Sequence, residues 1–278
     1  MTTLQAIVIA VLQGATELFP VSSLGHAVIL PALLRWNLDQ SASSFLPFLV
    51  MLHVGTAAAL LLFFWRDWWA ILTGVLGLAS PHQVSESRRV FVLVVIATIP
   101  AVIVGGVLEH FLRRLFGSPV VAACFLAVNG LLLIFGERLR AGGARRALAS
   151  LRPMDALVIG IWQCAALIPG ISRSGATIVG GLLRGIDHEG SAHFSFLIAT
   201  PIILGATVLE VPKLLRGGVP PGTVSLSVMA AVLAGITAWL STAFLMRYFR
   251  DHDRWALNPF AYYCLVAGLV SLGLLLAS

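Results

Sequence analysis

Charged residues are scarce in this sequence: aspartate, glutamate, lysine and arginine together make up only 11% of its 278 residues. Hydrophobic residues make up 59%, and the mean hydropathy is +0.96. Soluble domains carry about a quarter charged residues, because their surfaces must face water. The deficit of charge therefore excludes an ordinary soluble domain and predicts an integral membrane protein.

Lysine is almost absent, since Lys213 is the single lysine and the other basic residues are arginines. The net charge is +6, but the arginines lie in loops and at the ends of apolar segments rather than along one polar face. A nucleic-acid-binding protein needs such a face to contact phosphates. We therefore expect membrane topology, and no nucleic-acid partner, to explain the positive charge.

Cysteine is also scarce, and Cys124, Cys164 and Cys264 all lie in apolar segments without metal-ligand spacing. This pattern is typical of small buried side chains and predicts no disulfide framework. The first 26 residues lack a basic stretch and a small-residue cleavage site. We therefore expect no removable signal peptide.

Long apolar segments are abundant instead. A helix needs about 20 apolar residues to cross a bilayer. Six segments have this length, namely Phe45–Trp65, Val90–Leu108, Pro119–Gly136, Ala192–Leu209, Thr223–Met246 and Trp255–Ala277. They predict six transmembrane helices.

Two further stretches, residues 1–35 and 154–186, are apolar at both ends but are interrupted centrally by polar, glycine and proline residues. Non-helical backbone at membrane depth is tolerated only where protein or a water-filled cavity satisfies its polar groups. We therefore expect both stretches to be re-entrant hairpins that line a site.

A hairpin followed by three spans occurs twice, which predicts an internal duplication. Four residue pairs support it at a separation of 149 positions: Leu18 and Leu167, Pro20 and Pro169, Ser23 and Ser172, and Phe45 and Phe194. Because a unit with three crossings returns its copy upside down, the hairpins should enter from opposite faces and meet near the midplane. The expected fold class is an all-α polytopic membrane protein with an inverted-topology repeat, six transmembrane helices and two re-entrant helical hairpins.

The basic segment 137–153 is predicted to link the two repeats, residues 1–136 and 154–278, within one membrane domain. If this linker is cytoplasmic, twelve arginines lie inside, at positions 66, 88, 89, 138, 140, 145, 146, 152, 184, 247, 250 and 254. Five basic residues then lie outside, at positions 35, 113, 114, 213 and 216. This asymmetry agrees with the positive-inside tendency of membrane proteins.

Glu17 is the one acidic residue that lies away from the loops and span ends. An ionised carboxylate at membrane depth is costly, so Glu17 needs a cation, a metal or a proton. Arg173, within the second hairpin, is its basic counterpart, and its permanently charged guanidinium needs an anion. We expect an ion pair between them, a bound anion at Arg173, or both. The alternative for Glu17 is a protonated acid bonded to a neighbouring helix.

Serines and glycines follow the breaks in both hairpins, in "PVSSLGH" and "PGISRSGAT". They stand just before renewed apolar sequence, as at the N-termini of half-helices whose free amides attract anions. With Arg173, their hydroxyl groups predict a pocket for a polyanion; the hydroxyls belong to Ser22, Ser23, Ser172, Ser174 and Thr177. For any single serine, capping and close helix packing are the alternative.

Two histidines and a glutamine complete the set of candidates. His26 follows Ser23 by three residues, so both lie near one face of a helical turn, and His26 is a candidate base, phosphate acceptor or metal ligand. Gln13 precedes Glu17 by one turn and shares its face. His53, in "VMLHVGT", is interpreted as a packing residue, with support of the site as the alternative.

At these residues the sequence resembles the undecaprenyl-diphosphate phosphatase family of bacteria, also known as bacitracin-resistance proteins. One shared motif is a glutamate or glutamine four residues before a glutamate, followed by a proline, serine and histidine stretch, here Gln13, Glu17 and "FPVSSLGH". The other is P-G-x-S-R-S-x-x-T, here Pro169–Thr177. The resemblance extends to chain length, the order of apolar segments and "FSFLIATPIILGA".

The resemblance implies a multi-pass protein of the bacterial cytoplasmic (inner) membrane. It also implies hydrolysis of undecaprenyl diphosphate, a polyprenyl diphosphate lipid, to undecaprenyl phosphate and inorganic phosphate. This reaction recycles the carrier lipid for cell-wall synthesis and confers bacitracin resistance. A divalent cation, magnesium or calcium, is the implied cofactor, with Glu17 as a candidate ligand. Gln13 stands where many members carry a first glutamate, and although the family motif permits glutamine, this departure speaks against a metal site that needs two carboxylates.

By motif position, the resemblance makes active-site residues of Glu17, Ser23, His26, Arg173 and Thr177. For the implied substrate we expect Glu17 to hold the cation or the attacking water, His26 to act as base and Arg173 to clamp the phosphates. The expected substrate contacts are Gln13, Ser22, Gly170, Ser172, Ser174 and Thr177. Open questions are whether Ser23, His26 or water attacks phosphorus, which membrane face the pocket opens to, and whether the chain forms a homo-oligomer.

Two other functions compete with this interpretation. A polyprenyl-phosphate flippase or a secondary transporter would share the inverted repeats and broken helices, but would release no phosphate. A lipid phosphatase similar to the type 2 phosphatidic-acid phosphatase superfamily would share "SSLGH". That superfamily also needs an upstream lysine and arginine motif, and Lys213 lies in the wrong place for it.

Overall fold

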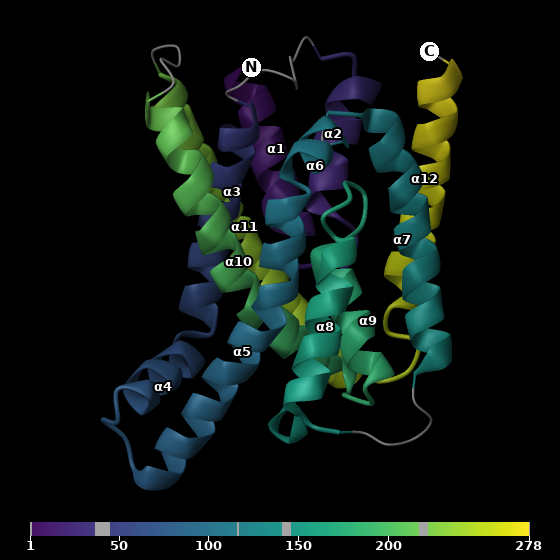
Figure 1. The fold of residues 1–278 in the computed structure, drawn as a ribbon. Helices are drawn as coiled ribbons and strands as arrows, with labels where there is room; N and C mark the ends of the chain where they lie inside the picture. The colour runs from purple at the N-terminus through teal and green to yellow at the C-terminus, as the bar shows by residue number, and fades with distance from the viewer. Residues whose placement is uncertain (1, 37–44, 116, 141–145, 217–221, 278) are drawn as a thin grey trace.

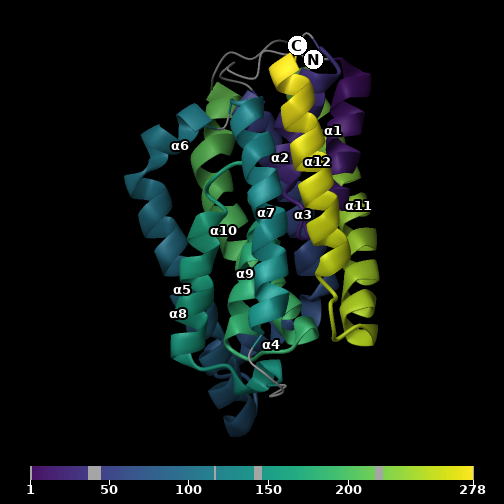
Figure 2. The ribbon, with the colours of Figure 1, turned by 90° about the vertical axis from the view of Figure 1, so that its right-hand side faces the viewer.

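The computed structural model describes residues 2–36, 45–115, 117–140, 146–216 and 222–277. They form a bundle in which long helices run side by side and both chain termini lie at the same end (Figures 1 and 2). The long helices are α3 (Phe45–Phe63), α5 (Pro81–Val107), α7 (Pro119–Leu139), α10 (His188–Arg216), α11 (Thr223–Asp251) and α12 (Asn258–Ala277). Within the described ranges, five helices are long and apolar enough to span a bilayer, and α3 joined to the helix after it gives a sixth. The expectation of an all-α polytopic membrane protein is confirmed.

A break after α3 was not predicted. The expected span Phe45–Trp65 ends at Phe63, and α4 (Trp65–Val75) continues after a bend of 77°. The apolar run meets Arg66 and Asp67 at this point, so the chain leaves the bundle axis where it becomes charged. α4 and the start of α5 project beyond one end of the bundle (Figure 1). A second short helix, α6 (Glu109–Leu115), follows α5 at the other end.

Two hairpins of short helices enter the bundle from opposite ends, as predicted for residues 1–35 and 154–186 (Figure 1). The first consists of α1 (Thr3–Thr16) and α2 (Ser23–Leu33), and the second of α8 (Pro153–Ala165) and α9 (Arg173–Leu183). Each helix has 11 to 14 residues, too few to cross a bilayer. The two tips therefore meet inside the bundle.

Each hairpin turn is closed by a serine. Ser22 caps α2 by accepting a hydrogen bond from the amide of Gly25, and Ser172 caps α9 by accepting one from Gly175. The caps Ser22 and Ser172 are 150 positions apart, whereas the residue pairs matched in the sequence are 149 apart. By the position of the caps, Ser23 therefore corresponds to Arg173 and not to Ser172. The two chemically distinctive residues thus open the two equivalent half-helices.

Gly170 is required in the second turn. Its φ is +101°, and a Cβ atom there would lie 2.3 Å from the carbonyl oxygen of Ala122 on α7. Only glycine combines this backbone conformation with such a close approach. Gly170 therefore allows the hairpin tip to pack against α7. We expected it to contact substrate, but it does not line the cavity described below.

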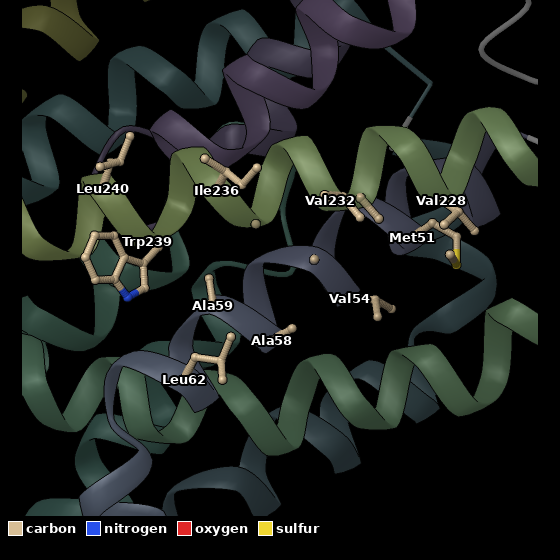
Figure 3. Close-up of a pocket in the computed structure, with 13 residues that line it drawn as sticks. Met51, Val54, Ala58, Ala59, Leu62, Val228, Val232, Ile236, Trp239 and Leu240 are labelled. Carbon is tan, nitrogen blue, oxygen red and sulfur yellow. The ribbon is translucent and has the colours of Figure 1, made fainter.

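Small residues bring the long helices close together. A Cβ atom on Gly55 of α3 would lie 1.9 Å from the carbonyl oxygen of Ala231 on α11, and one on Gly160 of α8 would lie 2.5 Å from that of Ala97 on α5. Backbone contact of this kind is typical of membrane bundles. An apolar groove of about 740 Å³ remains between α3 and α11 (Figure 3).

At the end of the bundle opposite the termini, arginines tie the second hairpin to the segment before it. Asp155 on α8 is fully buried and accepts hydrogen bonds from Arg146 at 2.8 Å and Arg184 at 2.7 Å. The short helix η1 (Leu148–Ser150) lies between Arg146 and Asp155 in the chain. Residues 141–145 of the predicted linker 137–153 lie outside the described residues. The cytoplasmic side of this end remains a prediction from the arginine count.

Replacing Asp155 with asparagine is expected to destabilise the protein by about 1–3 kcal/mol, because charge-assisted hydrogen bonds to both arginines are lost. Thermal unfolding in detergent measures this. Asp251→Asn is the matched control: its pair with Arg247 is 3.9 Å long and exposed, so little change is expected. Equal stability of Asp155→Asn and the unaltered protein at pH 7 would contradict the prediction.

The Asp155 contribution has a defined pH dependence. Burial alone raises the pKa of Asp155, but hydrogen bonds from Arg146, Arg184 and the amide of Arg152 outweigh burial and hold the pKa below its ordinary value of 3.8. A carboxyl group whose pKa is lower in the folded state than in the unfolded state stabilises the folded protein at pH values above its unfolded-state pKa. This stabilisation is lost as the pH falls through the folded-state pKa. The stability difference from Asp155→Asn should therefore be constant near neutral pH and shrink only in strong acid.

Candidate active site

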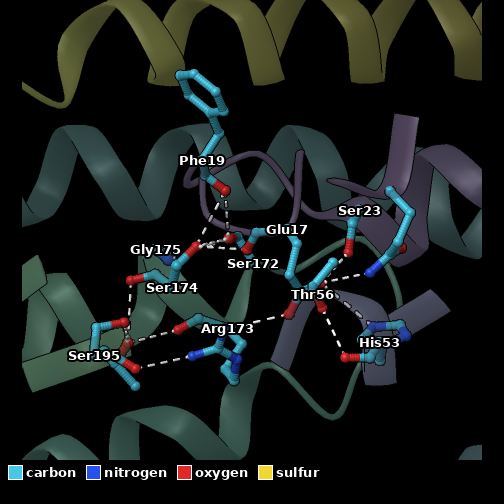
Figure 4. A network of polar contacts seen from close by, with 12 residues as sticks. Glu17, Phe19, Ser23, His53, Thr56, Ser172, Arg173, Ser174, Gly175 and Ser195 are labelled. Carbon is cyan, nitrogen blue, oxygen red and sulfur yellow. Dashed lines mark hydrogen bonds and ion pairs between the residues drawn. The ribbon is translucent and has the colours of Figure 1, made fainter. Parts of the chain in front are cut away.

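The polar residues of both hairpins meet where the tips meet (Figure 4). Glu17 is the C-cap of α1, Ser23 opens α2 and Arg173 opens α9. Glu17 is buried, and Nη2 of Arg173 donates to its Oε1 across 3.2 Å. The predicted pairing of Glu17 with Arg173 across the two hairpins is confirmed.

The other carboxylate oxygen of Glu17 has three neighbours. Gln13 Nε2 donates to Oε2 at 2.9 Å and Ser23 Oγ donates to it at 2.6 Å. His53 Nε2 lies 3.3 Å from the same oxygen. The short contact from Ser23 places Glu17 where it can accept the hydroxyl proton.

His53 on α3 takes a fuller part in the site than the sequence suggested (Figure 4). Its Nδ1 lies 2.8 Å from the carbonyl oxygen of Leu49, which can only accept, so Nδ1 carries hydrogen. Its Nε2 faces Oε2 of Glu17, and an ionised carboxylate also only accepts. A proton must therefore lie between Nε2 and Oε2, and an imidazolium at His53 satisfies both contacts.

A cavity of about 210 Å³ opens beside these groups. Its polar lining comprises Glu17, Ser22, Ser23, His53, Ser172 and Arg173. Its apolar lining comprises Leu24, Val50, Ala166, Ile171, Ile202, Ile203 and Ala206. One wall therefore suits an anionic group and the other suits a hydrocarbon chain.

Ser174 and Thr177, predicted to contact phosphate, lie behind this cavity rather than in its lining. Ser174 Oγ donates to the carbonyl oxygen of Phe19 at 3.1 Å and so joins the two tips. Thr177 Oγ1 lies 2.6 Å from Ser195 Oγ, and the Ser195 carbonyl accepts from Arg173 Nη1 at 3.1 Å. These hydroxyls hold Arg173 and the hairpin in place (Figure 4).

His26, predicted to be the base, does not line the cavity. Its Nδ1 lies 2.7 Å from the Ser22 carbonyl oxygen, and its Nε2 lies 2.7 Å from the hydroxyl of Tyr263 on α12. The two rings stack with centroids 5.6 Å apart. Spacing along α2 placed His26 near Ser23, but contacts with α12 direct the ring away, so its position does not support a role as base.

Asn129 on α7 joins both hairpin loops, and sequence reasoning missed it. Its Nδ2 donates to the carbonyl oxygen of Pro20 at 2.9 Å, and its Oδ1 accepts from the amide of Ser172 at 3.0 Å. Asn129 is fully buried. The available signal was one asparagine inside an otherwise apolar span. Ser195 on α10 was missed in the same way.

A resident divalent cation does not fit this donor set. Magnesium and calcium bind several oxygen ligands, usually including carboxylates. Among the described residues that line the cavity, Glu17 is the single carboxylate, and both of its oxygens already contact hydrogen-bond donors. Gln13, predicted to contact substrate, bonds to Glu17 and does not line the cavity. Among the residues that the structure describes, no three His, Cys, Asp or Glu side chains are grouped to hold a metal ion.

Comparison with known proteins gives one consistent result. A family model described as "Bacitracin resistance protein BacA" matches residues 6–270. An undecaprenyl-diphosphatase of Granulibacter bethesdensis is 68% identical over 98% of this chain and 96% of its own length. One of Acidiphilium cryptum is 58% identical over 98% of each chain, and undecaprenyl-diphosphatase 2 of Oenococcus oeni is 42% identical over 97% of each. The similarity covers both hairpins and all the long helices.

Proposed function

This chain belongs to the family of bacitracin resistance protein BacA, and from that premise we propose that it hydrolyses undecaprenyl diphosphate to undecaprenyl phosphate and inorganic phosphate. The observation that carries the proposal is the contact of Glu17 with both Ser23 and Arg173 at a cavity with one polar and one apolar wall. We further propose that it works in the bacterial inner membrane, recycles the carrier lipid for cell-wall synthesis and confers bacitracin resistance.

The cavity suits the two parts of this substrate. The diphosphate would lie against Arg173 and the first turns of α2 and α9, whose N-termini carry partial positive charge. The polyprenyl chain would leave along the apolar wall formed by side chains such as Val50, Ile202 and Ile203. Lipid substrate would therefore bind with its headgroup inside the bundle and its chain in hydrocarbon.

We assign the attack on phosphorus to Ser23. Its Oγ proton passes to Glu17, Oγ bonds to the terminal phosphorus, and the bond from that phosphorus to the bridging oxygen breaks. Undecaprenyl phosphate leaves with the electron pair of that bond. Water then hydrolyses the Ser23 phosphoester and releases inorganic phosphate. Arg173 and the His53 imidazolium stabilise the negative charge that gathers on the leaving phosphate.

Ser23→Ala is expected to lower phosphate release by about 10³-fold or more, because the attacking group is lost. Brief incubation with substrate labelled in the terminal phosphate should label Ser23 of the unaltered protein and leave Ser23→Ala unlabelled. Substrate labelled in the lipid-linked phosphate is the control and should label neither. Substantial activity in Ser23→Ala would contradict this assignment and indicate that water attacks phosphorus directly.

Phosphate release from polyprenyl diphosphates in detergent tests the function itself. A hydrolase releases phosphate where no membrane separates two compartments, whereas a flippase moves lipid across vesicles and releases none.

We propose that a magnesium or calcium ion needed for turnover enters with the diphosphate, since Glu17 is already occupied by donors. A chelator should then lower turnover but leave the unfolding temperature of the substrate-free protein unchanged.

A further inference from the structure

α4 carries an apolar stripe that none of the described residues covers. Trp65, Trp69, Leu72 and the C-cap Leu76 follow one another at steps of three or four residues, so they share one helix face. These four side chains are between 50 and 61% exposed. The opposite face packs on α5, where a Cβ atom on Gly74 would lie 2.2 Å from Cβ of Ser87.

The direction of α4 differs from that of the spans. Because the chain bends by 77° after α3, α4 turns steeply away from the axis of α3 and lies beyond the end of the bundle (Figure 1). The helix before α4 exposes Leu62, and α5, on which α4 packs, exposes Phe91 and Val95. Both helices that flank α4 in the chain therefore also expose large apolar side chains.

Basic side chains border the stripe. The Arg66 guanidinium lies over the Trp65 ring, 5.6 Å from its centroid. Arg88 on α5 is exposed and lies near the turn after α4, with Nη2 4.0 Å from where a Cβ atom of Gly77 would be. Asp67 points to the other side, where its carboxylate lies 3.4 Å from His193 Nε2. Tryptophan above the acyl chains with arginine at the phosphates is typical of helices in an anionic lipid surface.

We propose that α4 is an interfacial helix that lies in the headgroup layer of the leaflet at this end of the bundle. Trp65, Trp69, Leu72 and Leu76 reach the acyl boundary, and Arg66 and Arg88 contact the phosphates of anionic phospholipids. No residue of α4 lines the active-site cavity, so this lipid contact is separate from substrate binding. It anchors the end of α3, the helix that presents His53.

Quenching of tryptophan fluorescence by brominated lipids tests this proposal. The full chain is reconstituted in vesicles of phosphatidylcholine and phosphatidylglycerol whose acyl chains are brominated near the headgroup. The double variant Trp65→Tyr/Trp69→Tyr removes two of the seven tryptophans. We expect quenching of the unaltered protein to exceed that of the variant, while unfolding temperature and phosphate release in detergent stay unchanged.

Two further comparisons decide the partner. At equal mole fraction, brominated phosphatidylglycerol should quench Trp65 and Trp69 more than brominated phosphatidylcholine does, and Arg66→Gln/Arg88→Gln should remove that preference. Equal quenching of the unaltered protein and the tryptophan variant would overturn the proposal. Efficient crosslinking of Leu72→Cys between two chains would also overturn it, because a second copy would then cover the stripe.

Discussion

Arg173→Ala is expected to lower phosphate release from undecaprenyl diphosphate by about 10³-fold or more while the protein stays folded. Arg173 is the one arginine among the described residues that line the cavity, and its two terminal nitrogens are held by the Ser195 carbonyl and by Glu17. Positioned in this way, it can clamp the diphosphate without reorganising. Alanine removes the charge and both donors, and neither His53 nor the half-helix termini replace them.

Two companion variants make the Arg173 result specific. Arg173→Lys keeps the charge but loses the planar pair of donors, so partial activity is expected. Arg247→Ala removes an arginine whose side chain is 86% exposed, and full activity is expected. Phosphate release and thermal unfolding are measured for all three in the same detergent. Full activity of the Arg173→Ala protein would contradict the electrostatic role assigned to Arg173.

Glu17→Gln is expected to lower phosphate release by about 10²- to 10⁴-fold, the range for loss of a general base. Glutamine keeps the size of the side chain but cannot take the Ser23 proton across the 2.6 Å contact. Substrate binding should change much less, because Arg173 remains in the cavity. The expected signature is a large fall in kcat with a small change in KM, together with loss of Ser23 labelling.

A structural role for Glu17 gives a different pattern. If the carboxylate only balances the charges of Arg173 and His53, Glu17→Gln should lower the unfolding temperature while the folded fraction keeps a normal kcat. Glu86→Gln is the control, because Glu86 lies on the exposed start of α5 and contacts His82. Normal kcat and normal Ser23 labelling in Glu17→Gln would remove Glu17 from the mechanism.

The two hairpins explain why these predictions centre on Ser23 and Arg173. Both residues open a half-helix, at positions that the caps Ser22 and Ser172 make equivalent. Facing N-termini bring amides, hydroxyls and partial positive charge to one place. The two matched caps therefore build an anion site from both hairpins, and the difference between Ser23 and Arg173 at one matched position gives that site the proposed nucleophile and clamp.

Much of the fold could be predicted from the order of residues alone. Apolar length determined the spans, and the broken segments around Glu17 and Arg173 determined the hairpins, because charge at membrane depth must be paired. Opposite entry of the hairpins was expected from the odd number of crossings predicted for each repeat. The pairing of Glu17 with Arg173 followed from the same requirement.

Only the tertiary structure decided which side chains complete the site. Helical periodicity fixes the face on which a residue lies, but not the distant helix that this face meets. His26 and His53 therefore exchanged their expected positions: α12 holds His26 away from the cavity, while α3 brings His53 to Glu17. The buried link through Asn129 and the bend before α4 also depend on helices that are far apart in the chain, and no local pattern encodes those contacts.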